Sequence, residues 1–249
     1  LIIGIVILHS CKETGSAVPK SDILSIEQSA KIDSICQSFI KKENTIGFSI
    51  GISKNGNILF SKGYGLANIT SDKAATDSTV YPIASVSKFI TAIATMKMVE
   101  EGKLNLSDKV IDHLNEFPRQ KYMDEITIEH LLRHQSGLID HEDWFDSIYI
   151  EEKRVFTTQE LYAFLDQPLF FRPGTNYSYS NSGYVILSAI LETLEKKPFH
   201  QLIEEKISRP SGLNSLGMWP LNWGNANATL GYELIDGKVD TSLHMLTKA

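Results

Sequence analysis

Apolar residues near the start of the chain follow first a helical and then a strand-like pattern. Residues 26–42 carry apolar side chains every three or four positions, which predicts a helix. Its apolar side is formed by Ile32, Ile35, Phe39 and Ile40. The strand-like runs 46–53 and 57–64 lie on either side of Asn55-Gly56, the preferred pair for a tight turn. The chain is therefore predicted to begin with a helix and a β-hairpin.

The middle of the chain is predicted to be nearly all helix. One helix covers residues 85–101, and we expect it to be central, largely buried and stopped by Gly102. Its apolar surface comprises Phe89, Ile90, Ile93, Met96 and Met98. Thr127 is placed to cap a short helix, and the residues at 157 and 160 have capping-box spacing for the next. A further amphipathic helix is predicted over 182–196.

Strands are predicted to return near the end of the chain. Asp236-Gly237 marks a hairpin turn between residues 232–235 and Val239. A helix with a hairpin, a helical block at about 103–210 and returning strands indicate an α+β fold with a mostly helical insertion. We expect residues 26–249 to belong to this one domain.

The overall composition is that of an ordinary globular protein. With 249 residues and 42% hydrophobic content, the chain can bury a substantial core in one large domain or two interleaved ones. The net charge of −6 would repel nucleic-acid phosphates, and no dense run of Lys and Arg compensates, so no nucleic-acid partner is expected. Cys36 lies among apolar residues at helical spacing and is expected to be buried, so no disulfide is predicted.

Residues 1–10 resemble the end of a secretory signal peptide. Their apolar run, LIIGIVIL, is too short to span a bilayer, which needs roughly 20 residues. The run ending at Cys11 resembles a bacterial lipobox, in which the cysteine receives the lipid, and residues 11–25 would then be a lipoprotein linker. This predicts a protein anchored to the membrane of the cell envelope, on its periplasmic or extracellular side. The alternative is an ordinary signal peptide with an incidental cysteine.

The Ser-x-x-Lys sequence at 85–88 is the first candidate for chemistry. A hydroxyl nucleophile needs a nearby base, and residues three apart share one face of a helix. Ser38 and Lys41 have the same spacing at the exposed-looking end of a helix, so we interpret them as a solvated face. Ser85 differs because an apolar helix follows it, which would bring its hydroxyl near backbone N–H groups. Lys88 is either a surface lysine or, if buried, an amine whose neutral form is favoured and accepts a proton.

Tyr179 and Asn181 form the Tyr-x-Asn sequence of this chain. Alternate residues of an extended segment point the same way, so both side chains are able to face one site. An isolated tyrosine would more often be an aromatic half-buried in a loop. Together with Ser85 and Lys88, the pair indicates a serine acyl-transfer enzyme.

These motifs resemble the serine β-lactamase and penicillin-binding protein superfamily, in particular the branch of class C β-lactamases, D-alanyl-D-alanine carboxypeptidases and related esterases. Further matching pieces are LLRHQSGL at 131–138, FRPGTNYSYSN at 171–181 and Leu-Gly-Met at 216–218, and the match runs from about Ile46 to Tyr232. The resemblance implies a β-lactamase/transpeptidase-like fold, with an antiparallel sheet flanked by helices. It implies no metal and no organic cofactor, and we expect a monomer.

The resemblance also implies roles for the motif residues. Ser85 would attack a carbonyl carbon of a small-molecule or peptide substrate, and Lys88 and Tyr179 would share the proton transfer. Tyr179 would protonate the leaving nitrogen, Asn181 would hold Lys88 and bind the substrate amide, and the Ser85 N–H would form half of an oxyanion hole. The choice of base between Lys88 and Tyr179 stays open, as does the choice among β-lactam, D-Ala-D-Ala peptide and ester substrates. The competing interpretation is a noncatalytic module of the same fold that binds or senses cell-wall peptides or β-lactams.

A third element of the superfamily, Lys-Thr-Gly or His-x-Gly on a strand, has no match after Asn181. His244-Met245-Leu246 comes nearest but lacks the glycine. This element normally lies beyond the position of Ala249, so we expect a sequence truncated at both ends, with C-terminal strands missing. Residues 1–249 alone are then expected to be inactive and poorly stable, because apolar faces of the hairpin would be uncovered.

His130 and His134 have the spacing of zinc ligands on a helix. The sequence His-Leu-Leu-Arg-His lacks the glutamate that metalloproteases place after the first histidine, and helical histidine pairs without a third ligand are usually structural. We therefore predict no metal site.

Overall fold

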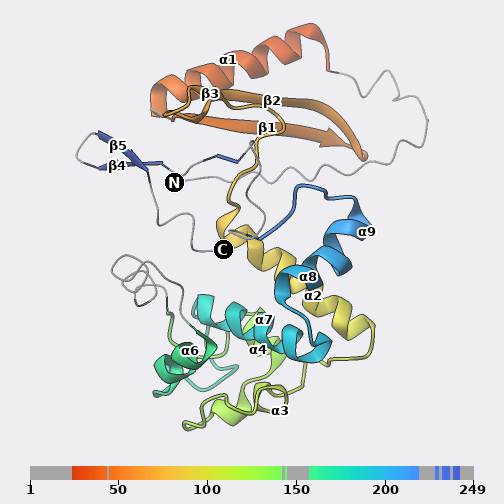
Figure 1. Ribbon diagram of the computed structural model, residues 1–249, viewed down its shortest axis with the longest axis vertical. Coiled ribbons are helices and arrows are strands. Elements are labelled where there is room, and N and C mark those ends of the chain that lie inside the picture. Colours follow the sequence, from red (N-terminus) through yellow and green to blue (C-terminus); the bar gives the residue numbers. More distant parts are fainter. Residues whose placement is uncertain are drawn as a thin grey trace. The chain divides into compact units, whose positions relative to one another are not determined.

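The computed structural model describes residues 24–43, 45–141, 144, 157–218, 228–229, 232–235 and 238–241 (Figure 1). The chain divides into two compact units, one made of residues 1–84 with 211–249 and the other of residues 85–210. Antiparallel strands gather in the first unit and helices in the second, so the predicted α+β class is confirmed. The predicted signal peptide and Cys11 lie outside the described residues. No described helix is both long and apolar enough to cross a bilayer.

A three-stranded antiparallel sheet and one helix form the first part of unit 1. Helix α1 (Ile26–Glu43) lies along the sheet of β1 (Gly47–Lys54), β2 (Asn57–Asn68) and β3 (Lys73–Ala74), in that order (Figure 1). The turn between β1 and β2 holds Asn55 at φ 51° and Gly56 at φ 78°. Two consecutive left-handed residues are what a tight hairpin turn requires, so the predicted Asn-Gly hairpin is confirmed.

The predicted apolar side of α1 is only partly correct. Cys36 is buried as expected, but Ile35 and Phe39 are 60% and 49% exposed. A polar anchor holds the helix to β2, because Asp33 Oδ1 accepts hydrogen bonds from Lys62 Nζ at 2.7 Å and Tyr64 OH at 2.5 Å. The helical spacing of apolar residues therefore predicted the element but not which of its side chains meet the sheet.

The C-terminal segment completes unit 1. Strands β4 (Tyr232–Ile235) and β5 (Lys238–Thr241) pair antiparallel, which confirms the predicted second hairpin, although its turn lies outside the described residues. Thr229 N donates to Val80 O at 3.0 Å, and Thr229 Oγ1 donates to Ala67 O at 2.7 Å. The segment that holds Thr229 and the segment that holds Ala67 and Val80 therefore share one hydrogen-bonded structure.

Unit 2 is built from short helices around α7. In chain order the elements are η2 (Ala84–Val86), α2 (Ser87–Glu100), α3 (Val110–His113), η3 (Met123–Glu125), α4 (Ile128–Leu132), α6 (Thr158–Leu165), α7 (Asn181–Glu195), α8 (Phe199–Ile203), η4 (Glu204–Ser208) and α9 (Arg209–Ser211). Helices α2, α3, α4 and α8 all contact α7. The side chains of Ile186, Leu187, Ile190 and Leu191 are fully buried, so α7 is the core of the unit.

Helix α2 departs from the prediction in its start and in its buried face. It begins at Ser87, after the η2 turn, and it ends before Gly102 as predicted. Phe89 and Met96, which were expected to belong to the buried surface, are 59% and 45% exposed. The buried side consists of Ile90, Thr91, Ala94, Thr95 and Met98. Small residues on this side allow close approach to α7, and each threonine hydroxyl donates to the carbonyl four residues earlier.

Side-chain caps define the starts of three helices, and two of these caps, Thr127 and Thr157, were predicted. Thr127 and Thr157 each accept a hydrogen bond from the backbone three residues on, and His130 and Glu160 return the contact, so both are capping boxes. Ser180 caps α7 by accepting from Gly183 N at 3.2 Å. The cap at Ser180 determines where α7 begins, and it thereby places Asn181 at the first helical position.

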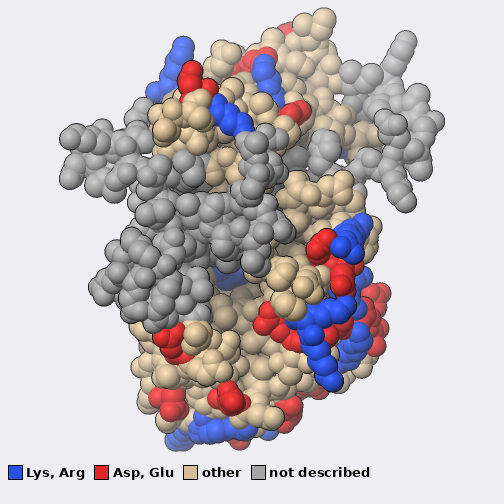
Figure 2. Space-filling model, viewed as in Figure 1, with Lys and Arg blue, Asp and Glu red and all other residues tan. Residues whose placement is uncertain are grey.

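Ion pairs connect the ends of α2 and α7 to η4. Lys103 Nζ contacts Glu101 at 2.9 Å and Glu195 at 2.5 Å, and Lys206 Nζ contacts Glu101 at 2.8 Å. Figure 2 shows acidic and basic side chains next to one another on the part of this unit that carries α8 and η4. The neighbouring Lys206 and Lys103 lower the pKa of Glu101 to about 2.

Candidate active site

Ser85 lies in the η2 turn, directly before the first turn of α2. Lys88 follows three residues later on the same side, and its Nζ donates to Ser85 Oγ at 3.3 Å. Ser85 is exposed, whereas Lys88 is half-buried. The structure therefore brings together the serine and the lysine that the spacing singled out, on a serine that is itself exposed.

Tyr179 and Asn181 reach the same place from the segment that enters α7. Tyr179 OH donates to Ser85 Oγ at 2.8 Å, and Lys88 Nζ lies 4.9 Å from the centre of the Tyr179 ring. Asn181 Oδ1 accepts from Lys88 Nζ at 2.6 Å. Ser180 between them is 1% exposed and faces inward as the cap of α7. Because the backbone of Ser180 is extended, the side chains on either side of it, those of Tyr179 and Asn181, point the same way.

Asp140 lies behind Asn181. Its carboxylate accepts from the Asn181 backbone N–H at 2.9 Å and from the side-chain Nδ2 at 3.2 and 3.3 Å. A continuous series of hydrogen bonds therefore runs from Ser85 through Lys88 and Asn181 to Asp140.

His134 supports Tyr179 from the side. Its ring centre lies 4.5 Å from that of Tyr179 and 5.2 Å from that of Tyr184. Its Nδ1 accepts from Ser180 N at 3.1 Å, so it also fixes the backbone between the two motif residues. Burial and the positive charge of Lys88 lower the pKa of His134, which favours the neutral ring that this acceptor role needs.

Asp140, His134 and Tyr184 were not assigned a role from the sequence. His134 belongs to the LLRHQSGL block that was quoted as a motif, but its contact with Tyr179 spans a long stretch of chain. Asp140 follows that block by two residues. A single aspartate carries no spacing signal that would connect it to an asparagine 41 residues later.

The two histidines at zinc-ligand spacing, His130 and His134, each use a ring nitrogen to accept a hydrogen bond from a backbone N–H group. His130 Nδ1 accepts from Thr127 N at 3.3 Å as part of the α4 capping box, and His134 Nδ1 accepts from Ser180 N. Among the described residues, no group of three or more His, Cys, Asp and Glu side chains is placed to hold a metal ion.

The second Ser-x-x-Lys pair, Ser38 and Lys41, does not belong to this site. Ser38 and Lys41 are both exposed on α1, as predicted for a solvated face. His244-Met245-Leu246 falls outside the described residues, and so do Cys11 and the predicted anchor.

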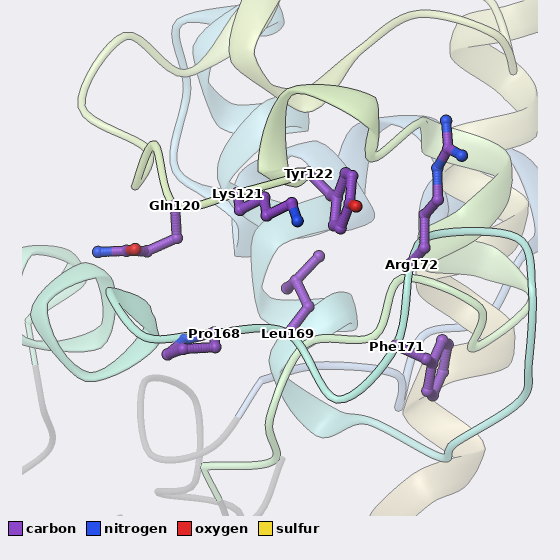
Figure 3. A pocket seen from close by; sticks show the side chains of 7 residues that line it. All are labelled: Gln120, Lys121, Tyr122, Pro168, Leu169, Phe171 and Arg172. Carbon is purple, nitrogen blue, oxygen red and sulfur yellow. The ribbon is translucent and has the colours of Figure 1, made fainter.

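A pocket of about 230 Å³ opens at another place on the helical unit (Figure 3). Lys121 and Leu169 point toward the Tyr122 ring, and Arg172 extends beside it. The Arg172 guanidinium already makes a two-point contact with Glu125, at 2.7 and 3.1 Å. Phe171 and Arg172 at the start of the FRPGTNYSYSN block line this pocket, but Ser85, Lys88, Tyr179 and Asn181 do not, so it is separate from the candidate active site.

A family model described as "Beta-lactamase" matches residues 32–248. Among curated proteins, "Protein flp" of Staphylococcus aureus is 30% identical over 214 residues, which cover 85% of this chain and 42% of that protein. "Penicillin-binding protein 4*" of Bacillus subtilis is 32% identical over 164 residues, covering 65% of this chain and 36% of that protein. The chain therefore spans less than half of the length of these relatives.

The fold also matches solved structures. The octameric penicillin-binding protein homologue from Pyrococcus abyssi superposes with a TM-score of 0.77 at 29% identity. The match covers 86% of this chain and 50% of that one. The arrangement of helices and antiparallel strands is thus that of the β-lactamase/transpeptidase-like fold.

Proposed function

The chain belongs to the beta-lactamase family, and on that premise we propose that it is a serine hydrolase that works through an acyl-enzyme intermediate on Ser85. One observation carries the proposal: Tyr179 OH and Lys88 Nζ both contact Ser85 Oγ, at 2.8 and 3.3 Å. These are the distances expected between a nucleophile and proton-transfer groups before a substrate binds.

Acylation uses the three side chains together. Ser85 Oγ attacks the carbonyl carbon of an amide or ester, and the hydroxyl proton passes to the pair formed by Tyr179 and Lys88. Tyr179 then gives a proton to the leaving nitrogen or oxygen, so the bond to the leaving group breaks and an ester on Ser85 remains. A water molecule attacks this ester in the second stage, gives its proton to the same pair, and releases the acid while the Ser85 hydroxyl is restored.

The remaining groups stabilise this arrangement. Asn181 Oδ1 binds Lys88 and keeps its amine beside the serine, and the Ser85 backbone N–H serves as one donor to the oxyanion. The loss of one such donor typically costs about 3 kcal/mol of transition-state stabilisation. A module that only binds a ligand would need no pair of proton-transfer groups on a single hydroxyl, which favours the enzyme over the noncatalytic alternative.

We extend the proposal to substrate class and location. The penicillin-binding relatives support a cell-envelope role with a β-lactam, a D-Ala-D-Ala peptide or an ester as acyl donor. A lipid on Cys11 would hold the protein at the membrane. The expected monomer stays a prediction, and light scattering on the purified protein measures it directly.

Intact-mass spectrometry of the complete gene product tests the proposal. A fluorescent penicillin, a short-chain p-nitrophenyl ester and a D-Ala-D-Ala peptide are offered separately, and we expect an adduct of one acyl group per chain with at least one of them. Ser85→Ala should remove the adduct. Ser38→Ala is the matched control, because Ser38 has the same spacing to a lysine on α1, and it should label like the wild type.

Two outcomes would overturn the proposed function. One is a cooperatively folded wild type that neither gains an adduct from any of the three acyl donors nor hydrolyses any of them. The other is an adduct that persists in Ser85→Ala, which would place the reactive group elsewhere.

A further inference from the structure

The Asp140 carboxylate lies at the start of α7, where it accepts two kinds of N–H group from the same residue. It accepts from the Asn181 backbone N–H at 2.9 Å and from Asn181 Nδ2 at 3.2 and 3.3 Å. Both Asp140 and Asn181 are half-buried. A carboxylate at the first turn of a helix is also favoured by the helix dipole, so charge and hydrogen bonding hold it in place.

This contact determines which way the Asn181 amide faces. The two ends of an amide differ, since the oxygen accepts hydrogen bonds and the nitrogen donates them. A carboxylate accepts only, so it binds the Nδ2 end and turns Oδ1 toward Lys88, where the Nζ to Oδ1 distance is 2.6 Å. The carboxylate therefore selects one of the two amide orientations.

The opposite orientation would damage the contact between Lys88 and Ser85 in either protonation state of the amine. A protonated amine would lose an acceptor and face a second donor. A neutral amine would have its lone pair occupied by an Asn181 N–H, so it would no longer be able to take a proton from Ser85. Both cases weaken the link of 3.3 Å between Lys88 Nζ and Ser85 Oγ.

We propose that Asp140 is a positioning residue of the active site, which acts through the orientation of the Asn181 amide to keep Lys88 in contact with Ser85. The inference rests on the proposed function, because it concerns how the same site is kept ready for acylation.

Two contacts of Ser182 supply a control for the possibility that Asp140 only holds its chain segment against α7. Ser182 Oγ donates to Ile139 O at 2.8 Å, and His141 Nδ1 lies 2.9 Å from Ser182 Oγ. These contacts join the same two chain segments as Asp140 and Asn181 do, but they do not involve the Asn181 amide. Ser182→Ala therefore loosens the attachment of residues 139–141 to α7 and leaves the amide orientation intact.

The test is a double-mutant cycle on the second-order rate constant for acylation of Ser85, measured with the fluorescent penicillin, or with the p-nitrophenyl ester if that is the donor that labels. We expect Asp140→Asn to lower this constant about 10- to 100-fold, by analogy with the loss seen when the hydrogen-bond partners of metal ligands are removed. In an Asn181→Ala background the same change should have little effect, since the amide through which Asp140 acts is gone. Asp140→Glu keeps an anionic acceptor and should retain more activity than Asp140→Asn, while Ser182→Ala should acylate like the wild type.

Equal fold losses from Asp140→Asn with and without Asn181 would overturn the inference, as would a loss of the same size in Ser182→Ala. A second readout does not depend on acylation: in protein labelled with ¹⁵N-asparagine, the side-chain amide signal of Asn181 is the one missing from Asn181→Ala. Asp140→Asn should shift that signal and speed the exchange of its hydrogens, and Ser182→Ala should not. An unchanged signal in Asp140→Asn would refute the positioning role, whereas a wild type that neither takes an acyl group nor hydrolyses any of the donors would refute the proposed function alone.

Discussion

Tyr177 and Tyr179 both place their rings against His134, with ring centres 6.0 and 4.5 Å from the imidazole. The hydroxyl of Tyr179 additionally donates to Ser85 Oγ at 2.8 Å. Variants of the two tyrosines therefore distinguish the effect of ring packing, which both residues share, from the effect of the hydroxyl group, which contacts Ser85 only in Tyr179.

Tyr179→Phe should slow acylation of Ser85 by about 100- to 10,000-fold, the usual contribution of a positioned proton-transfer group. The stack on His134 keeps the ring in place, so the melting temperature should hardly change. Tyr177→Phe is the matched control and should acylate at the wild-type rate. Equal rates in the two variants would show that the Tyr179 hydroxyl has no part in the chemistry.

Local spacing is enough to predict two pairs among the site residues. Lys88 follows Ser85 by three positions and Asn181 follows Tyr179 by two, so the members of each pair are able to face one side. The contact between the pairs, from Tyr179 OH to Ser85 Oγ, spans 94 positions, and it was expected from the family resemblance and not from spacing. Asp140 differs, because its relation to Asn181 exists only after residues 139–141 have been folded against α7. Sequence spacing carries no record of that contact, and a structure was needed to find it.

At the scale of elements, capping residues predicted helix boundaries more reliably than the spacing of apolar residues predicted buried faces. Thr127, Thr157 and Gly102 mark helix boundaries through local hydrogen bonds and backbone conformation, and the structure confirms all three. The exposed positions of Phe89 on α2 and Ile35 on α1 show the limit of periodicity. An apolar stripe is wider than the contact it makes, and the neighbouring element decides which part of it is covered.

The ion pairs at the ends of α2, α7 and η4 lead to a pH-dependent prediction. Contacts with Lys206 and Lys103 lower the pKa of Glu101 from 4.5 to about 2 in the folded protein. The unfolded chain therefore binds a proton more readily, so the stabilisation is present above pH 4.5 and is lost as the pH falls toward 2. Glu101→Gln should lower the melting temperature near neutral pH and make its decline below pH 4.5 shallower than in the wild type.

Differential scanning calorimetry from neutral pH down to about pH 3 measures how the melting temperature falls with pH in the wild type and in Glu101→Gln. Glu129→Gln is a suitable control, because Glu129 pairs with Arg133 within a single helix turn and both side chains are at least half exposed. An exposed pair of this kind contributes little, so its removal should leave the pH dependence unchanged. If the melting temperature of Glu101→Gln fell as steeply below pH 4.5 as that of the wild type, Glu101 would not be the source of the pH dependence.

At the scale of the whole molecule, the two units differ in how the chain builds them. Unit 2 is a single continuous segment that holds Ser85, Lys88, Tyr179 and Asn181, whereas unit 1 joins residues 1–84 to residues 211–249. The hydrogen bond from Thr229 Oγ1 to Ala67 O spans 162 positions. The hairpins within unit 1 were predictable from local turns, but this closure between its two segments was not, because nothing near Thr229 indicates Ala67 as its partner.

Thr229→Val tests whether this closure stabilises unit 1 separately from unit 2. Valine keeps the shape of the threonine side chain, which is 7% exposed, but it leaves the buried Ala67 carbonyl without its donor. An unsatisfied buried group costs about 1–3 kcal/mol, so amide hydrogens of β2 should exchange faster by roughly one to two orders of magnitude.

Thr229→Ser is the control. It retains the hydroxyl, so the amide hydrogens of β2 should exchange as in the wild type. Amides of α7 should be unaffected in both variants, since their protection arises within the continuous unit. Faster exchange in α7 to the same degree as in β2 would show instead that the chain unfolds as one cooperative body, and that the residues around Ser85 depend for their order on the hydrogen bond between Thr229 and Ala67 in unit 1.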